Sequence, residues 1–127
     1  MPLWDRGFLT GRFKKTSDIE QGDRRHDHPR FHEENFNQNL AIVRRLEPLA
    51  AAKQCTLAQL ALAWLLSRSK TIVPIFGAKH VSYVEQNVRA ADLRLTAEDL
   101  RKLDEAAPKG ATAGLRYPAA TIGNVNR

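Results

Sequence analysis

The sequence of 127 residues has a single cysteine and no apolar run long enough to cross a membrane. Cys55 alone cannot form a disulfide within the chain, and it suits a reducing compartment such as the cytoplasm. The longest apolar run, residues 57–66, falls short of the roughly 18 residues of a membrane span, so we interpret it as a buried helix. The first residues lack the basic leader and apolar run of a signal peptide. We therefore expect a cytoplasmic protein with no membrane partner.

Internal repeats and low-complexity segments are also missing from the sequence. Its hydrophobic fraction of 43% is sufficient to build a core. The length suits one domain rather than two.

Acidic residues are too few to balance the basic ones. Fourteen Asp and Glu face twenty Lys and Arg, which gives a formal charge of +6 and a pI of about 9.9. This excess favours a polyanionic partner, either nucleic acid or a phosphorylated small molecule. The basic residues are scattered, however, with adjacent arginines only at Arg24-Arg25 and Arg44-Arg45 and no aromatic residues between them. We therefore prefer a solvated surface with a basic ligand pocket, and no nucleic-acid partner.

Three histidines lie in the first 35 residues, a stretch without steady periodicity that predicts a long loop. His26, His28 and His32 have the spacing H-x-H-x3-H, and no matching cysteine or carboxylate pattern accompanies them. We interpret them as part of a surface loop and predict no metal site.

Hydrophobic periodicity predicts two helices in the middle of the chain. The first begins near Phe36, and Pro48 within it predicts a kink or a break near Glu47, because proline lacks the amide hydrogen and crowds the preceding turn. The second begins after Thr56, with Gln59 placed to complete a capping box. Its apolar residues form one face that Leu62 and Leu66 widen, which predicts packing against a sheet or another helix.

Residues 71–76, "TIVPIF", are the one convincing strand. A continuous apolar run of this kind is typical of a parallel strand covered on both faces. Two further helices follow: one over residues 81–91, with Val81, Val84 and Val88 facing inward, and one with Thr96 as N-cap and Asp99 as its partner. The predicted order is helix, helix, strand, helix, helix, and one strand does not make a sheet.

Several spaced motifs resemble segments of the aldo-keto reductase family. "PLWDRGFLTGRF" is similar to the family's loop after the seventh barrel strand, and "CTLAQLALAWLLSRSKTIVPIFGAKHVSYVEQN" is similar to its seventh helix, eighth strand and eighth helix. "LTAEDLRKLDEAAPKG" and "AGLRYP" resemble the closing helix and tail. The resemblance implies an α/β fold in which residues 1–127 are a partial domain. That domain is the C-terminal third of a (β/α)8 TIM barrel, mostly helical with one clear strand.

The resemblance also implies NADP(H) as cofactor and assigns residues to it. Gly77, Ala78 and Lys79 would form a phosphate site, with Lys79 pairing with the adenosine 2′-phosphate. Glycine lets the backbone approach a ligand, and amides at a helix N-terminus favour an anion. Further along, Tyr83 would cover the adenine, while Gln86 and Asn87 would read the adenine and its ribose.

A second group in the first loop would line the pyrophosphate and the nicotinamide ribose; it comprises Pro2, Leu3, Gly7 and Leu9. The sequence departs from the family pattern at three positions: Met1 replaces a serine, Ala78 the more frequent threonine, and Gln86 the usual acid.

The matched motifs contain no catalytic residue, because the family's Tyr, Lys, Asp and His lie upstream of them. We therefore expect a truncated NADP(H)-dependent reductase of aldehydes and ketones, whose complete form takes a small-molecule carbonyl substrate. An alternative is a non-catalytic remnant or binding module, inactive unless the missing part of the barrel complements it. A helical nucleic-acid binder is disfavoured because the second helix is apolar, whereas a recognition helix is polar.

Overall fold

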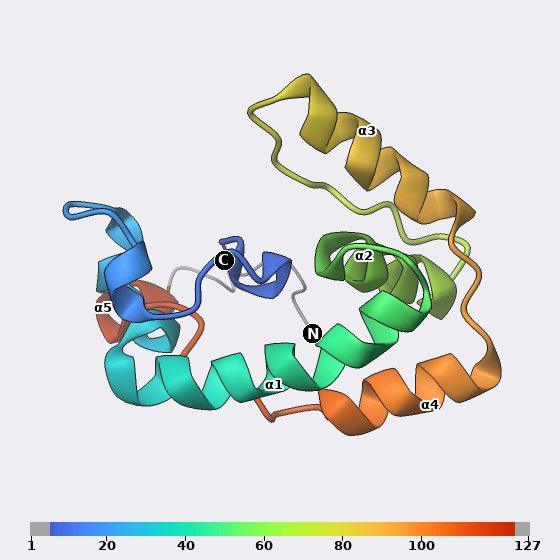
Figure 1. Cartoon of the computed structure of the whole chain (residues 1–127). Coiled ribbons are helices and arrows are strands. Elements are labelled where there is room, and N and C mark those ends of the chain that lie inside the picture. The colour runs from blue at the N-terminus through green and yellow to red at the C-terminus, as the bar shows by residue number, and fades with distance from the viewer. Residues whose placement is uncertain (1–5, 124–127) are drawn as a thin grey trace.

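The computed structural model describes residues 6–123, which form helices joined by loops and short 3-10 turns (Figure 1). The helices are α1 (Glu33–Ala52), α2 (Leu57–Arg68), α3 (Val81–Arg89), α4 (Ala97–Ala106) and α5 (Ala119–Ile122). The turns are η1 (Phe8–Thr10), η2 (Thr16–Asp18), η3 (Arg24–Asp27), η4 (Pro29–Phe31) and η5 (Ala90–Asp92). The prediction of a mostly helical chain is therefore confirmed within these residues.

Helix α1 continues through its proline. It begins at Glu33 and ends at Ala52 with Pro48 inside it, so of the predicted kink or break near Glu47 the break is wrong. Pro48 and Arg44, whose carbonyl loses its helical partner, are both exposed. Water can therefore satisfy that carbonyl, and the helix tolerates the lost hydrogen bond.

The predicted capping boxes of α2 and α4 are confirmed. At α2, Thr56 Oγ1 accepts from the Gln59 amide at 3.1 Å, and Gln59 Oε1 accepts from the Thr56 amide at 2.9 Å. At α4, Thr96 Oγ1 accepts from the Asp99 amide at 3.2 Å, and Asp99 Oδ2 accepts from the Thr96 amide at 2.7 Å. Both helices therefore begin where local side-chain chemistry satisfies their first amides.

The core consists of two hydrophobic clusters that share α1. The first, hereafter the phenylalanine cluster, fixes the loop before α1 through edge-to-face ring pairs. The ring centroid of Phe8 lies 5.5 Å from that of Phe31 and 5.1 Å from that of Phe36. Its buried members are Phe8, Phe13, Ile19, Phe31, Phe36, Leu40 and Val43. The second joins α1 to α2 and α4; its buried members are Ile42, Leu46, Ala50, Leu60 and Leu103.

A buried asparagine on α1 holds the C-terminal tail. Asn39 Nδ2 donates to the carbonyls of Arg30 and Ala113, at 3.2 and 3.1 Å, and Asn39 Oδ1 accepts from the Ala113 amide at 2.8 Å. The side chain of Asn39 is 4% exposed, so these bonds replace those it would make to water. The otherwise irregular tail is thereby fixed beside η4 and α1.

The predicted strand is wrong. Residues 71–76 form no strand in the part of the chain that the structure describes, and Val73 and Ile75 are 82% and 93% exposed. A strand needs neighbouring backbone groups to bond with, and residues 6–123 provide no such partner. Figure 1 shows that this segment and α3 extend away from α1 and α4.

The prediction that α3 turns its valines inward is also wrong. Val81, Val84 and Val88 are 75%, 42% and 59% exposed, whereas Asn87 and Ala90 on another side of the helix are buried. The aliphatic face of α3 has nothing to pack against among the described residues, for the same reason that residues 71–76 lack a sheet.

No single helix in residues 6–123 is both long and apolar enough to cross a membrane. Helices α1 and α2 have the length and apolar composition of a membrane span only when they are taken together, and they are bent by 88° relative to one another.

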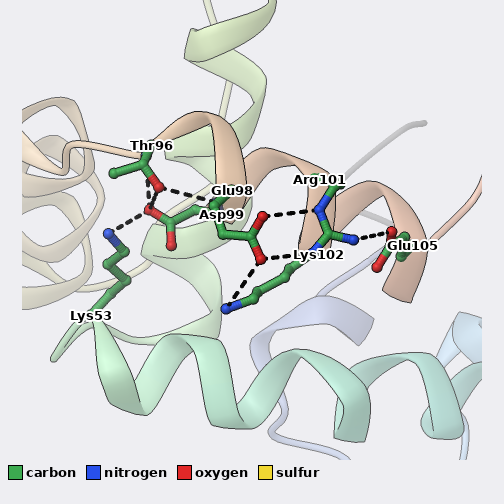
Figure 2. Close-up of polar contacts among 7 residues, drawn as sticks. All are labelled: Lys53, Thr96, Glu98, Asp99, Arg101, Lys102 and Glu105. Atoms are coloured by element: carbon green, nitrogen blue, oxygen red, sulfur yellow. Dashed lines mark hydrogen bonds and ion pairs between the residues drawn. The ribbon is translucent and has the colours of Figure 1, made fainter.

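An ion pair joins the start of α4 to the end of α1 (Figure 2). Lys53 Nζ lies 2.5 Å from Asp99 Oδ2, the same oxygen that accepts from the Thr96 amide and hydroxyl. Lys53, and then the Thr96 backbone amide, lower the pKa of Asp99 from 3.8 to about 2. The other ion pairs of α4 in Figure 2 join Arg101 to Glu98 and Glu105, and Lys102 to Glu98, on its exposed surface.

The Asp99 carboxylate should stabilise the fold at neutral pH and lose this effect in acid. Its folded pKa of about 2 lies below the unfolded value of 3.8, so the stabilisation is complete above 3.8 and is lost as the pH falls toward 2. Asp99→Asn keeps a capping oxygen but removes the charge, and we expect a loss of about 1 kcal/mol at neutral pH. Urea unfolding followed by circular dichroism, from neutral pH down to the acid range, measures it.

Glu98→Gln is the control on the same helix, because the ion pairs of Glu98 are exposed and screened by solvent. An equal loss of stability at neutral pH from Glu98→Gln and Asp99→Asn would contradict a special role for the Lys53 pair.

Candidate functional site

The residues predicted to bind the cofactor fall in two separate parts of the structure. Gly7 and Leu9 lie at η1, while the others lie on α3 and in the loop before it. Pro2 and Leu3 lie outside the described residues.

Gly7 shapes the first loop through its backbone. Its φ of 85° is in the left-handed region, which glycine adopts without strain. Its carbonyl accepts from the Thr10 hydroxyl at 2.7 Å and from the Thr10 amide at 3.2 Å, which closes η1. The glycine is therefore required for the turn itself.

Leu9 has a packing role in this arrangement. It lies against the phenylalanine cluster and lines a small apolar cavity together with Leu57 and Trp64. The cavity has a volume of about 20 Å³, room for a single water molecule and far less than a ligand pocket requires.

Gly77, Ala78 and Lys79 form an open loop before α3, and all three residues are exposed. An added Cβ on Gly77 would meet no atom within 4 Å, so nothing in the described chain blocks the approach of a ligand. The loop leads into the N-terminus of α3, where His80 is the N-cap and makes no capping hydrogen bond with its side chain in the described structure. The first turn of α3 also contains no acidic residue. The Tyr83 amide donates to the His80 carbonyl at 3.0 Å, whereas the amides of Val81 and Ser82 have no acceptor in the described structure and remain available for an anion beside Lys79.

Tyr83 provides an aromatic surface one turn into α3. Its ring centroid lies 5.1 Å from that of His80, at an interplanar angle of 84°. The side chain is 49% exposed, so one side of the ring is accessible to a planar ligand.

Gln86 and Asn87 have different surroundings although they are adjacent. Gln86 is exposed, and its backbone carbonyl accepts from Gln59 Nε2 at 3.0 Å. Asn87 is only 8% exposed, because it lies on the buried side of α3 with Ala90. In this arrangement a nucleotide can reach Gln86 and cannot reach the side chain of Asn87.

The two parts of the predicted site are not brought together. Both η1 and α3 pack on α2, but Figure 1 shows them on different sides of that helix. The structure thus places Lys79, His80 and Tyr83 at one end of α3, apart from Gly7 and Leu9.

Gln59 has a second role that the sequence analysis missed. Its side-chain oxygen completes the capping box of α2, while its side-chain nitrogen binds the Gln86 carbonyl of α3. The signal was present in principle, because a glutamine that uses its oxygen in a capping box still has two amide hydrogens to donate.

The histidines of the first loop make separate contacts. His26 Nε2 lies 3.2 Å from the Glu20 carbonyl oxygen, and the His28 ring centroid lies 6.5 Å from that of Tyr117 at an interplanar angle of 69°. Within residues 6–123, no group of three His, Cys, Asp or Glu side chains is arranged to hold a metal ion.

Comparison with known proteins places these features in a family context. A sequence model described as "Aldo/keto reductase family" matches residues 1–108. Aldo-keto reductase yakc of Schizosaccharomyces pombe, whose name specifies NADP(+), is 42% identical over 113 residues, which are 89% of this chain and 33% of that protein. Probable aldo-keto reductase 1 of Glycine max is 46% identical over 90 residues, 71% of this chain and 26% of that protein.

A third relative, aldo-keto reductase str7 of Strobilurus tenacellus, is 38% identical over 103 residues, 79% of this chain and 31% of that protein. The chain thus spans about a third or less of the length of these curated relatives. No solved structure matches the chain.

The bond between Gln59 and Gln86 should control how firmly α3 is held on α2. Gln59→Glu keeps the capping oxygen and replaces the donor to the Gln86 carbonyl by an acceptor. Loss of one hydrogen bond costs about 1 kcal/mol, so the amides of α3 should exchange with solvent roughly fivefold faster while those of α2 are unchanged. Residue-resolved hydrogen exchange measures both helices in one experiment.

Gln59→Ala is the matched variant, because it removes both bonds and should accelerate exchange in α2 and α3 together. Unchanged exchange in α3 of Gln59→Glu would show that apolar contacts alone hold that helix.

Proposed function

Because this chain belongs to the aldo/keto reductase family, we propose that it supplies the NADP(H)-binding section of an enzyme that reduces aldehydes and ketones to alcohols. The family implies a (β/α)8 barrel, and barrel enzymes bind phosphates at the loops after their last strands. The observation that carries the proposal is the open loop of Gly77, Ala78 and Lys79, which runs into the uncapped N-terminus of α3.

We assign the adenosine 2′-phosphate to this loop. Lys79 supplies a full positive charge, and the first amides of α3 supply donors at the positive end of the helix. Gly77 leaves room for the phosphate to approach the backbone. The exposed face of Tyr83 then covers the adenine, and Gln86 binds its edge.

The remaining assignments require α3 and the first loop to change position relative to one another. Asn87 can contact the adenosine ribose only after α3 turns on α2, since its side chain is now buried. Gly7 and Leu9, with Pro2 and Leu3, line the pyrophosphate and nicotinamide ribose in the proposed complete site. The hydrogen bond from Gln59 to the Gln86 carbonyl is compatible with such a rotation of α3, because replacing one hydrogen bond by bonds to water has a low free-energy cost.

The chemistry that NADPH supplies in this reaction is the transfer of a hydride to a carbonyl carbon. The share of this chain is to bind and orient the cofactor, since none of its residues is assigned as the acid that protonates the carbonyl oxygen. We propose a cytoplasmic enzyme with a small carbonyl compound as substrate, in keeping with the single cysteine and the NADP(+) in the name of the fission yeast relative.

A chimera tests the 2′-phosphate assignment in the setting of a complete chain. Residues 1–108 would replace the matching section of the Schizosaccharomyces pombe reductase. We expect this chimera to bind NADPH more tightly than NADH by about one to two decades, because a charge-assisted hydrogen bond contributes roughly 1.5–3 kcal/mol. Lys79→Ala should remove most of the difference, as measured by fluorescence titration with each cofactor.

Lys70→Ala is the control, because Lys70 is also exposed and lies on the loop that follows α2. It should keep the preference for NADPH. Equal dissociation constants for NADPH and NADH in the unmutated chimera would contradict the assignment of the 2′-phosphate to this loop.

A further inference from the structure

We propose that two arginines packed on one tyrosine ring form a binding site for the carboxylate group of a small molecule. The arginines are Arg6 of the first loop and Arg116 of the C-terminal tail, and the ring is that of Tyr117; these three residues are hereafter the arginine site. In the enzyme proposed above, the small molecule is an aldehyde or ketone substrate that carries a carboxylate. That it is a substrate rests on the proposed function, whereas anion binding by the chain does not.

The tail is fixed to the first part of the chain shortly before it reaches Tyr117. Asn39 bonds to both backbone groups of Ala113, and Arg30 Nε donates to the Gly114 carbonyl at 3.4 Å. Gly114 has a φ of 80°, and an added Cβ there would lie 3.0 Å from the backbone of η4. Figure 1 shows the tail, which ends in α5, beside the loop before α1. The ring of Tyr117 is therefore held close to the first loop by bonds that do not involve the ring itself.

The backbone of Arg6 has an unusual conformation. Its φ of 54° lies in the left-handed region, which few residues other than glycine adopt. Such a conformation persists where the surroundings determine it. Here Gly7 closes η1 directly afterwards, and Phe8 is 6% exposed in the phenylalanine cluster. The Arg6 side chain thus extends from a fixed point of the loop to the ring of Tyr117.

Two cations share one aromatic ring at the arginine site. The Cζ atoms of Arg6 and Arg116 each lie 5.3 Å from the ring centroid of Tyr117. One guanidinium on a ring is a common attractive contact, but two on the same ring are close enough to repel each other. An anion beside the ring relieves this repulsion and can accept hydrogen bonds from both groups.

The positive charge of the tail is not balanced within the tail itself. Residues 108–123 contain no Asp or Glu. In the first loop, Asp18 accepts from the Lys14 amide at 2.7 Å, and Asp23 pairs with Arg25 at 2.8 Å. These two carboxylates of the loop are therefore engaged with groups other than the arginine site.

The chemistry of the site suits a small organic carboxylate. The planar guanidinium group donates two parallel hydrogen bonds to the two oxygens of a carboxylate. Arg116 is exposed, so a ligand can approach it from solvent, and the half-buried ring of Tyr117 offers a flat apolar surface to the carbon chain of the ligand.

The position of Arg6 connects the arginine site to the proposed reaction. Arg6 directly precedes Gly7, which is assigned to the nicotinamide ribose in the proposed complete site. A carbonyl group that accepts the hydride lies beside the nicotinamide, so a carboxylate on the same molecule can reach Arg6.

The pyrophosphate of the cofactor is the other anion expected near Gly7. The residues assigned to the cofactor all lie within residues 1–108, the section that the family model matches, whereas Arg116 and Tyr117 lie beyond it. We therefore assign the arginine site to the substrate, whose identity differs from one enzyme to another, and not to the shared cofactor.

Ligand binding to the chain alone tests the site directly. The isotopically labelled chain would be titrated with levulinate, a ketone that carries a carboxylate, and followed by nuclear magnetic resonance. We expect the side-chain Nε–H signals of Arg6 and Arg116 to shift and to saturate at millimolar levulinate. Levulinamide, the neutral amide of the same ketone, should shift neither signal.

Three variants locate the anion. Arg116→Gln removes one charge, and Arg6→Asn removes the other while it keeps a residue that adopts the left-handed region readily. Each should weaken levulinate binding roughly tenfold, because each loses a charge-assisted hydrogen-bonded pair. Arg12→Gln is the matched control, since Arg12 is an exposed arginine of the same loop whose Cζ lies 5.7 Å from the ring centroid of Phe13. It should leave binding unchanged, and circular dichroism of each variant shows that the helices remain.

A chimera tests whether the ligand is a substrate. The whole chain, tail included, would replace the matching section of the Schizosaccharomyces pombe reductase. The values of kcat/KM would be compared for para-carboxybenzaldehyde and its neutral amide, para-carbamoylbenzaldehyde. Arg116→Gln should lower kcat/KM for the carboxylate roughly tenfold through a higher KM, and leave the value for the amide and the dissociation constant of NADPH unchanged.

Four results would overturn the proposal. Equal binding of levulinate and levulinamide, or full levulinate binding by Arg116→Gln, would show that the arginine site holds no carboxylate. An equal effect of Arg116→Gln on both aldehydes would show that the carboxylate is not part of a substrate. Weaker NADPH binding by Arg116→Gln would place the cofactor pyrophosphate at the site. Absence of turnover by the unmutated chimera would count against the proposed function, while levulinate binding by the chain alone still decides whether the site exists.

Discussion

Helix α1 carries the packing on which the rest of the described structure depends. One part of its buried face enters the phenylalanine cluster with Phe36 and Leu40, and the other enters the cluster of α2 and α4 with Leu46 and Ala50. A helix of 20 residues is long enough to serve both clusters, and its continuity through Pro48 keeps them on one helix. The first loop, the tail held by Asn39 and the start of α4 held by Lys53 are all fixed against this helix.

Helix α3 is attached in another way. Its contacts with α2 include the polar bond from Gln59 and the burial of Asn87 and Ala90, whereas its most apolar side is in solvent. Elements with few buried apolar contacts open at a lower free energy than the core does. The residues proposed to bind the cofactor phosphate therefore lie in the loop before a helix with few buried apolar contacts, which can change position at low cost.

Local chemistry made several features predictable from the sequence. Thr56 with Gln59, and Thr96 with Asp99, define their helix starts by bonds within four residues, and both were predicted correctly. Features that depend on distant residues were not predictable in the same way. Residues 71–76 have the composition of a covered strand, but strand formation requires neighbours that residues 6–123 do not supply. The burial of Asn87 and the ring packing of the first loop depend on three-dimensional neighbours that no periodicity indicates.

Pro74 has a consequence for how copies of this chain behave when they are crowded, as on a polysome. Fibrils grow because each strand pairs on both of its edges, so that every added copy offers a fresh template to the next. On one edge Pro74 has no amide hydrogen and the Ile72 amide donates to the Ser69 carbonyl, so of the three alternate residues of that edge only Phe76 keeps an amide without a backbone acceptor. A second strand therefore pairs less readily along that edge, which disfavours growth of a stack despite the exposure of Val73 and Ile75.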